Sequence, residues 1–241
     1  MKLSFKSLEE VLTKGQREDG RSLVDLSMRT DTVFCRSLVS TGMLSEEQMQ
    51  RAAQRYRLGR SRDGGVVFWE IDEQQRIRDG KVMYYRDDCH RDKVHNPSWV
   101  TAKLKAQGDL AELFEPQRCL FGLHLIKAQS TMHNAQLTVA VVEAEKTAVI
   151  CSELFPEYVW MAAGGETMLN AAKLYPLREH KVVLFPDTDP EGKTWQDWQE
   201  KAEAAQPEFR YPIRVSRILE SHATDAQKTA KVDIVDLIFE D

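Results

Sequence analysis

The sequence predicts an α/β protein in which a parallel sheet flanked by helices follows a smaller, basic α+β region. Two observations predict this class. From residue 137 onward, short apolar runs alternate with helical segments, which is the pattern of βαβ units with right-handed crossovers. Before that point, runs rich in aromatic and β-branched residues are separated by turn residues, which favours hairpins. The chain of 241 residues has room for one large domain or two small ones.

The composition is that of an ordinary soluble globular protein, with 42% hydrophobic and 29% charged residues. No apolar run approaches the roughly 20 residues that a membrane span needs, and the first residues lack the apolar core of a signal peptide. We therefore expect a cytoplasmic protein without a membrane partner. The four cysteines are scattered and form no CxxC pair, which argues against a disulfide framework or a structural zinc site.

Charge is distributed unevenly along the chain. Residues 1–130 contain 22 Lys and Arg against 19 Asp and Glu, whereas residues 131–241 contain 11 against 19. Within residues 51–105 the ratio is 13 to 8 in favour of the basic residues. A basic first part beside an acidic second part suits a nucleic-acid surface that leads to a metal-loaded site. An ordinary solvated surface is the alternative interpretation.

Short helices are predicted in the first 60 residues, at 7–12, 32–38 and 46–56. The third helix begins with the spacing of a capping box, because Ser45 precedes Gln48 by three residues.

An aromatic-rich β-hairpin is predicted next, from strands at 65–71 and 76–85. Alternating basic and aromatic residues in strands can bind a sugar-phosphate chain and stack its bases. Ordinary sheet packing is the alternative for the hairpin, and a solvated surface is the alternative to phosphate contact for the arginines of the preceding helix. We expect nucleic-acid contacts from Arg55, Arg57, Arg76, Arg78, Lys81, Arg91 and Lys93.

A helix at 100–106 and a buried apolar run at 117–126 follow the hairpin, and the polar segment 127–136 reads as a linker. The predicted domains are a helical region at 1–60, a basic β-rich subdomain at 61–130 and the parallel-sheet domain at 131–241.

Four strands and the helices between them make up the parallel-sheet domain. The strands are predicted at 137–142, 158–162, 181–185 and 210–215. The helices are predicted at 146–154, 167–174 and 195–205, with a last helix at 230–239 that carries Asp233 and Asp236 on one face.

Acidic residues follow two of these strands, where sites form in open α/β sheets. Glu143 follows the first strand, and Asp187 and Asp189 follow the third. Carboxylates that meet at one edge repel one another unless a cation lies among them, and Mg²⁺ needs only one or two protein carboxylates with water and phosphate. This favours metal-assisted phosphoryl or nucleotidyl transfer, with Glu143 as acid, base or further ligand. The alternative is that these acids only cap helices.

Three motifs carry a resemblance to a known family. The segments Val141-Val-Glu143-Ala-Glu-Lys-Thr-Ala148, Ala163-Gly-Gly165 and Phe185-Pro-Asp187-Thr-Asp189-Pro-Glu-Gly192 resemble the motifs of the Toprim domain, which bacterial primases, topoisomerases and some nucleases share. The resemblance covers about residues 137–241 and implies a Rossmann-like sheet. It implies catalytic roles for Glu143, Asp187 and Asp189, and metal ligation by these three together with Asp233 and Asp236.

The region before the sheet also resembles replicative primases. Gly64-Gly-Val-Val-Phe-Trp-Glu-Ile-Asp72 and Arg78-Asp-Gly-Lys81 are similar to the basic subdomain that precedes Toprim in those enzymes, and residues 55–190 resemble uncharacterised Toprim-like proteins of plasmids and conjugative elements. The chain departs from the Toprim pattern at Ala144, where glycine is usual, and at Thr147, where an acid is often found.

The resemblance implies a primase-like, Mg²⁺-dependent (or Mn²⁺-dependent) nucleotidyltransferase of a mobile element, acting in DNA replication. Its substrates would be single-stranded DNA and nucleoside triphosphates, and a helicase or another replication protein would be a further partner. Two alternatives stay open. One is a catalytically inactive DNA-binding accessory protein with a Toprim fold, and the other is a Toprim nuclease.

Overall fold

The computed structural model describes residues 27–130 and 137–239, which form two compact units that divide between Cys119 and Leu120. Each unit is described by itself. The predicted domain boundaries at 60/61 and 130/131 stay predictions, and the helix predicted at 7–12 lies outside the described residues. Among the described residues, no helix combines the length and the apolar character that crossing a membrane requires.

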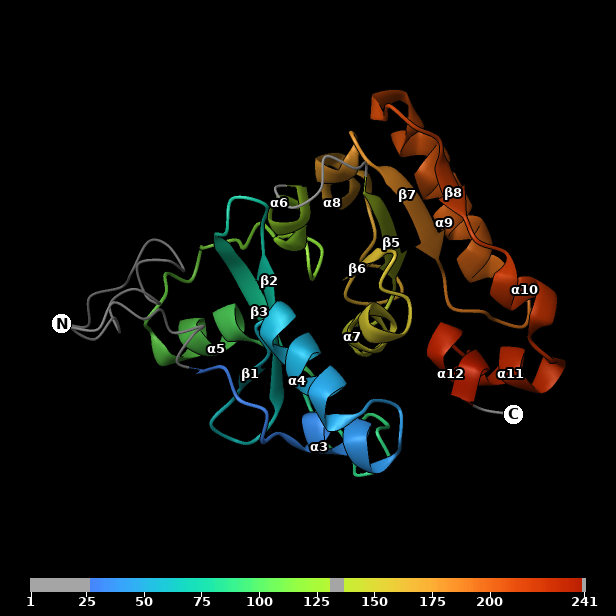
Figure 1. Cartoon of the computed structure of the whole chain (residues 1–241). Coiled ribbons are helices and arrows are strands. Elements are labelled where there is room, and N and C mark those ends of the chain that lie inside the picture. The colour runs from blue at the N-terminus through green and yellow to red at the C-terminus, as the bar shows by residue number, and fades with distance from the viewer. Residues whose placement is uncertain (1–26, 131–136, 240–241) are drawn as a thin grey trace. The chain divides into compact units, whose positions relative to one another are not determined.

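The first unit is built around an antiparallel sheet with the strand order β1-β2-β3-β4 (Figure 1). The strands are β1 (Gly59–Arg60), β2 (Val66–Ile71), β3 (Ile77–Met83) and β4 (Ser98–Trp99). The helices are α3 (Val33–Ser40), α4 (Glu46–Arg55) and α5 (Val100–Gln107). The predicted hairpin is thus confirmed as β2 and β3, which pair in antiparallel register.

Both faces of this hairpin are covered. On one face the ring of Phe68 packs edge-on against Phe34 of α3, with 5.3 Å between the ring centroids. On the other face Trp69 packs with Val82 and Val100. Gly80 lies opposite Trp69 in the register, and a Cβ there would come within 2.7 Å of the indole ring. The hairpin is therefore a packed core element on both sides.

The predicted capping box at the start of α4 is confirmed. The Ser45 hydroxyl accepts a hydrogen bond from the backbone N–H of Gln48 (3.2 Å), and the Gln48 side chain accepts one from the backbone N–H of Ser45 (2.8 Å). Two of the amides that a helix start leaves without partners are satisfied in this way.

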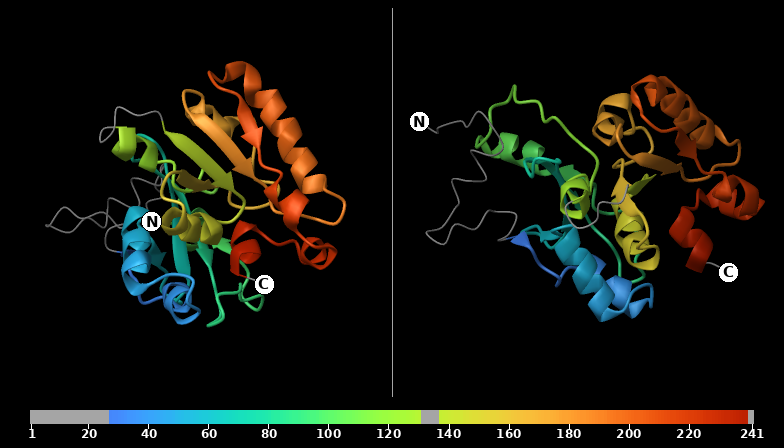
Figure 2. Two further views of the ribbon diagram at one scale, coloured as in Figure 1. Left: turned by 45° about the vertical axis from the view of Figure 1, so that its right-hand side comes forward. Right: turned by 45° about the horizontal axis from the view of Figure 1, so that its top comes forward.

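The second unit contains the predicted parallel sheet, with the strand order β6-β5-β7-β8. The strands are β5 (Thr138–Val142), β6 (Val159–Ala162), β7 (Lys181–Phe185) and β8 (Ile213–Val215). The helices are α6 (Leu125–Ser130), α7 (Glu145–Leu154), α8 (Ala171–Leu174), α9 (Lys193–Ala205), α10 (Ile218–His222), α11 (Asp225–Ala230) and α12 (Ile234–Phe239), with 3-10 turns at Tyr175–Leu177 and Gln206–Glu208. The two views in Figure 2 show α9 running alongside β8.

Several element boundaries differ from the prediction for local reasons. The helix expected at 167–174 is a single turn, because Asn170 is extended and caps α8. The strand expected at 210–215 begins at Ile213, after Pro212, which has no N–H to donate. The expected linker starts inside α6, and its residues 131–136 lie outside the described residues.

Candidate active site

The carboxyl ends of β5 and β7 bring Glu143 and Asp187 together in the second unit. β5 and β7 pair in parallel from Thr138↔Lys181 to Val142↔Phe185, so the residues that follow them lie at the same edge of the sheet. The carboxylate of Glu143 accepts a hydrogen bond from the backbone N–H of Asp187. The Glu143 carbonyl accepts a second one from the N–H of Gly164 at 2.9 Å, which ties the loop after β6 to the same place.

Glu143 is buried with an unsatisfied oxygen. The residue is 7% exposed, and among the described residues nothing donates a hydrogen bond to its Oε1. Burial raises the pKa of Glu143 to about 7, and the charges of Glu166 and Asp233 act in the same direction. The amide of Asp187 and the charge of Lys231 oppose this shift. A carboxyl group in this setting exchanges its proton near neutral pH.

The start of α12 delivers two more carboxylates to this edge. Asp233 is the N-cap of α12, and its Oδ1 accepts hydrogen bonds from the amides of Val235 (2.8 Å) and Asp236 (2.9 Å). Asp236 returns the contact, because its Oδ2 accepts the N–H of Asp233 at 3.1 Å. The hydroxyl of Thr147 donates a short hydrogen bond to Asp233 Oδ2. Asp233 and Asp236, three residues apart, therefore cap the start of α12 reciprocally. This corrects the interpretation that the two acids lie on one face of a helix.

We define the acid cluster as Glu143, Asp187, Asp233 and Asp236. Burial raises the pKa of Asp187 well above its usual value, and the charges of the other three members raise it further. Lys146 opposes this shift and lies 3.7 Å from Asp236, measured from Nζ to Oδ1. Four carboxylates thus share a partly buried edge with too little positive charge, which is an arrangement that a cation stabilises.

Asp189 performs a different task from Asp187, although only one residue separates them. Its Oδ1 accepts the backbone N–H groups of Glu191 (3.0 Å) and Lys193 (3.2 Å), and its Oδ2 accepts that of Thr194 at 2.7 Å. These bonds lower the pKa of Asp189 to about 2, against the opposing effect of its burial. Asp189 therefore closes the loop that leads into α9, and its role as a metal ligand stays a prediction.

Replacing Asp189 tests this structural role. We expect Asp189→Ala to lower the free energy of unfolding by about 1–2 kcal/mol. Asp189→Asn should lower it by a similar amount, because an asparagine NH₂ group cannot accept the backbone N–H that one of the carboxylate oxygens accepts. Since the folded pKa of about 2 lies below the unfolded value, the contribution of this carboxylate is present above about pH 4 and is lost as pH falls toward 2. Urea unfolding of the three proteins between pH 2 and 7 measures both effects. Equal stability of the alanine variant and the parent at pH 7 would contradict the prediction.

Three residues around the acid cluster were not predicted as site residues. Lys146 and Thr147 contact Asp236 and Asp233, and Lys231 lies 3.7 Å from Glu166 while its charge reaches Glu143. The signal for Lys146 and Thr147 was their place in the first turn of the helix after Glu143, which faces the same edge. Lys231 gave no such signal, because only the tertiary fold brings it near.

The residues of the acid cluster fit a hard cation in chemistry. All their donor atoms are oxygens, and one of them, Glu143 Oε1, is buried without a hydrogen bond among the described residues. Within the described part of the chain, no three His, Cys, Asp or Glu side chains are arranged closely enough to form a complete ligand set. Mg²⁺ is usually held by one or two carboxylates with water and substrate phosphates, and Glu143 and Asp187 are the carboxylates that would hold it here.

The predicted nucleic-acid residues of the first unit fall into two groups. Arg76 and Arg78 both pair with the buried carboxylate of Asp72, at 2.9 and 2.7 Å. Arg57 donates to the side chain of Gln75 at 3.1 Å, and Arg55 and Lys81 are half-buried. Arg91 and Lys93 are exposed and line a cavity of about 530 Å³ with Arg86, His90, Asp92 and Val94. Arg91 and Lys93 therefore offer the more accessible positive charge.

The two tyrosines of the hairpin are engaged within the first unit. The hydroxyl of Tyr84 donates to Asp63 at 2.6 Å, and its ring stacks on His95 with 4.7 Å between centroids. The ring of Tyr85 packs at 4.7 Å from Phe34, inside the aromatic core. Their regular spacing with basic residues therefore reflects internal packing in this structure.

Comparison with known proteins identifies the fold. A family model described as "Domain of unknown function (DUF6371)" matches residues 33–188, and no curated protein matches the chain. The solved DnaG catalytic core is similar to 91% of this chain over 77% of its own length, with 13% identity and a TM-score of 0.54. The RNA polymerase domain of Mycobacterium tuberculosis primase DnaG aligns with 90% of the chain over 83% of its own length, at 11% identity and a TM-score of 0.49. The primase fragment of the bacteriophage T7 primase-helicase protein aligns with 82% of this chain over 73% of its own length, with 19% identity and a TM-score of 0.42.

At such identities the likeness shows the fold alone. It confirms the predicted α/β class, with a parallel four-stranded sheet flanked by helices as in the DnaG catalytic core.

Proposed function

The chain belongs to the family described as Domain of unknown function (DUF6371), and from this premise we propose that it is a primase-like, Mg²⁺-dependent nucleotidyltransferase acting on single-stranded DNA. The observation that carries the proposal is the acid cluster. Four carboxylates, one with a buried oxygen that lacks a hydrogen bond among the described residues, lie at the carboxyl edge of the sheet. The fold that holds them is similar to the DnaG catalytic core. This edge is where α/β sheets bind their ligands.

Each acidic residue has a distinct part in this proposal. Glu143 and Asp187 would hold the cation, which would neutralise charge on the phosphates of an incoming nucleoside triphosphate. Without the cation, the pKa values of both carboxyl groups are raised, so binding of the cation would release protons from this pair. Asp233 and Asp236 add negative charge from α12. Asp189 fixes the loop that carries Asp187.

Thr147 is a specific reason to keep the inactive accessory protein as the second candidate. It stands where an acid is often found in Toprim domains, and its hydroxyl binds Asp233 instead of adding a carboxylate. Fewer ligands would weaken cation binding. The proposal includes an origin in a mobile element and a replication helicase as a partner.

A primer-synthesis assay tests the proposal. The purified chain is incubated with a single-stranded DNA template and nucleoside triphosphates, with Mg²⁺, with Mn²⁺ or with EDTA. We expect oligonucleotide products that depend on the divalent cation. Degradation of the DNA would instead identify a nuclease. Binding of DNA with neither reaction in either metal would reject the enzyme and leave the accessory protein.

Salt dependence of DNA binding tests the contribution of the first unit. If Arg91 and Lys93 contact phosphates, log K should fall linearly with log salt, and Arg91→Ala and Lys93→Ala should each reduce that slope by about 0.7 on single-stranded DNA. Arg76→Ala is the matched control, because Arg76 pairs with Asp72 and its loss should act on stability more than on the slope. Fluorescence anisotropy with a labelled oligonucleotide measures the slopes. Unchanged slopes in both variants would remove these residues from the interface.

A further inference from the structure

A second cavity lies on the sheet of the second unit, apart from the acid cluster. Its volume is about 570 Å³. Thr138 and Lys181, which line it, are the first residues of β5 and β7, whereas Glu143 and Asp187 follow the last residues of these strands. Glu143 comes five positions after Thr138, which corresponds to about 16 Å along the strand. The cavity and the acid cluster are thus separate places on the sheet.

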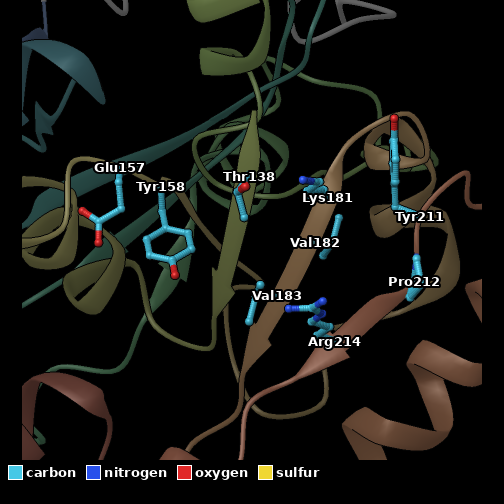
Figure 3. Close-up of a pocket in the computed structure, with 9 residues that line it drawn as sticks. All are labelled: Thr138, Glu157, Tyr158, Lys181, Val182, Val183, Tyr211, Pro212 and Arg214. Carbon is cyan, nitrogen blue, oxygen red and sulfur yellow. The ribbon is translucent and has the colours of Figure 1, made fainter. Parts of the chain in front are cut away.

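The lining of the cavity follows from the alternation of side chains along the strands. Val182 of β7 is 1% exposed and contributes to the core, whereas Lys181 and Val183 on either side of it face the other way. In the parallel register Lys181 lies beside Thr138, and Val183 lies beside Arg214 of β8. These four side chains therefore share one face of the sheet. Figure 3 shows this face, with Glu157 and Tyr158 on the β6 side and Tyr211 and Pro212 on the β8 side.

Two cations lie on this face without a partner among the described residues. Lys181 and Arg214 are both exposed, and no described residue forms an ion pair or a hydrogen bond with either side chain. They stand on adjacent strands, two residues apart in register, so that like charges are neighbours. A bound anion would remove this repulsion, and the guanidinium of Arg214 is suited to bidentate contact with a phosphate.

Aromatic side chains flank the two cations. Tyr158 stands at the β6 side of the cavity, and Tyr211 stands at the β8 side (Figure 3). The ring of Tyr158 packs at 5.6 Å from Trp160 and 6.4 Å from Phe185, measured between centroids, which holds it in place. Val183 provides an apolar floor between the tyrosines. Such a site offers a stacking or apolar contact for a planar ring together with positive charge.

We propose that this cavity binds a free nucleoside phosphate, with its phosphate on Lys181 and Arg214 and its base against Tyr158. Size and charge favour a small ligand over a nucleic-acid strand. The volume lies within the range of about 300–1,000 Å³ that small-molecule pockets occupy. Residues 131–241 carry 19 acidic against 11 basic side chains, and this excess repels a polyanion more strongly than a mononucleotide. The inference does not depend on the proposed enzymatic activity.

Calorimetric titration of the full chain with AMP and ADP tests this inference. EDTA is present throughout, so that cation-dependent binding at the acid cluster does not contribute. We expect saturable binding with one site, which the Lys181→Ala/Arg214→Ala double variant weakens by about tenfold or more, because charged hydrogen bonds are lost. Both side chains are exposed, so the variant should fold as the parent does. Lys201→Ala, which removes one partly buried charge of α9 from its pair with Asp197, should bind like the parent.

Further ligands separate the contributions and the competing outcomes. Adenosine and ribose 5-phosphate should each bind more weakly than AMP, since one lacks the phosphate and the other the base. Equal binding of ribose 5-phosphate and AMP would overturn the contact with the base. Nucleotide binding that the double variant leaves unchanged, the absence of nucleotide binding, or binding only of a single-stranded oligonucleotide at Lys181 and Arg214 would each overturn the proposal.

Discussion

Asp187→Asn is expected to abolish metal-dependent primer synthesis and at the same time to stabilise the metal-free chain. Asp187 is one of the two carboxylates best placed to hold the cation. Replacing even a residue that only hydrogen-bonds to a metal ligand lowers metal affinity or activity by about 10- to 100-fold. We therefore expect a loss of about 100-fold or more in the rate of product formation. The same substitution removes one charge from four crowded carboxylates, whose mutual repulsion raises the pKa of Asp187. In EDTA the variant should be more stable by about 0.5–2 kcal/mol, as is common where a functional residue is removed.

Thermal unfolding with and without Mg²⁺ links the two halves of this prediction. A cation that binds only the folded chain raises the melting temperature of the parent, and the increase should vanish in Asp187→Asn. Asp197→Asn serves as the control, because it removes the same charge from a half-exposed residue of α9 that pairs with Lys201 and lies outside the acid cluster. If Asp187→Asn lowered stability in EDTA, Asp187 would have a structural role. If it kept both the activity and the response to Mg²⁺, the acid cluster would not be the metal site.

Asp79→Ala is expected to destabilise the first unit more than any other substitution considered for it. Asp79 is fully buried and accepts four hydrogen bonds. They come from the amides of Gly80 (2.8 Å) and Thr101 (3.1 Å), from the Thr101 hydroxyl (2.8 Å) and from Arg118 Nε (3.1 Å). Its removal leaves buried donors and a guanidinium without partners. Breaking a buried ion pair in this way costs about 3–5 kcal/mol.

This carboxylate joins three segments that are distant in sequence. It connects β3 with the first turn of α5 and with Arg118, whose guanidinium also lies 3.6 Å above the ring of Trp99. Urea unfolding monitored by tryptophan fluorescence measures the effect. Asp31→Ala is the control, because Asp31 forms an exposed pair with Arg60, and such pairs contribute about 1 kcal/mol or less. A loss for Asp79→Ala no larger than that of the control would show that the network is not required.

The sequence by itself determined the longer strands, most of the helices and the class of the fold, whereas the two-residue strands β1 and β4 and the helices α6, α10 and α11 were not predicted. Buried parallel strands read as continuous apolar runs, so β5, β6 and β7 were visible in the residues alone. The same local patterns placed Glu143 and Asp187 directly after strands, and the spacing of Ser45 and Gln48 identified a helix start. Each of these features depends on neighbours within a few residues.

Only the tertiary structure decided which charges meet. Asp187 and Asp189 are equivalent in the sequence pattern. In the structure the carboxylate of Asp189 accepts hydrogen bonds from backbone amides, whereas Asp187 belongs to the acid cluster. The hydrogen bond between Thr147 and Asp233 spans 86 residues, so no local periodicity contains it. Arg76 and Arg78 likewise read as free cations until the hairpin turns them onto Asp72. Contacts of this kind depend on how the elements pack, and the energy of a charge is set by the partner and the burial that packing provides.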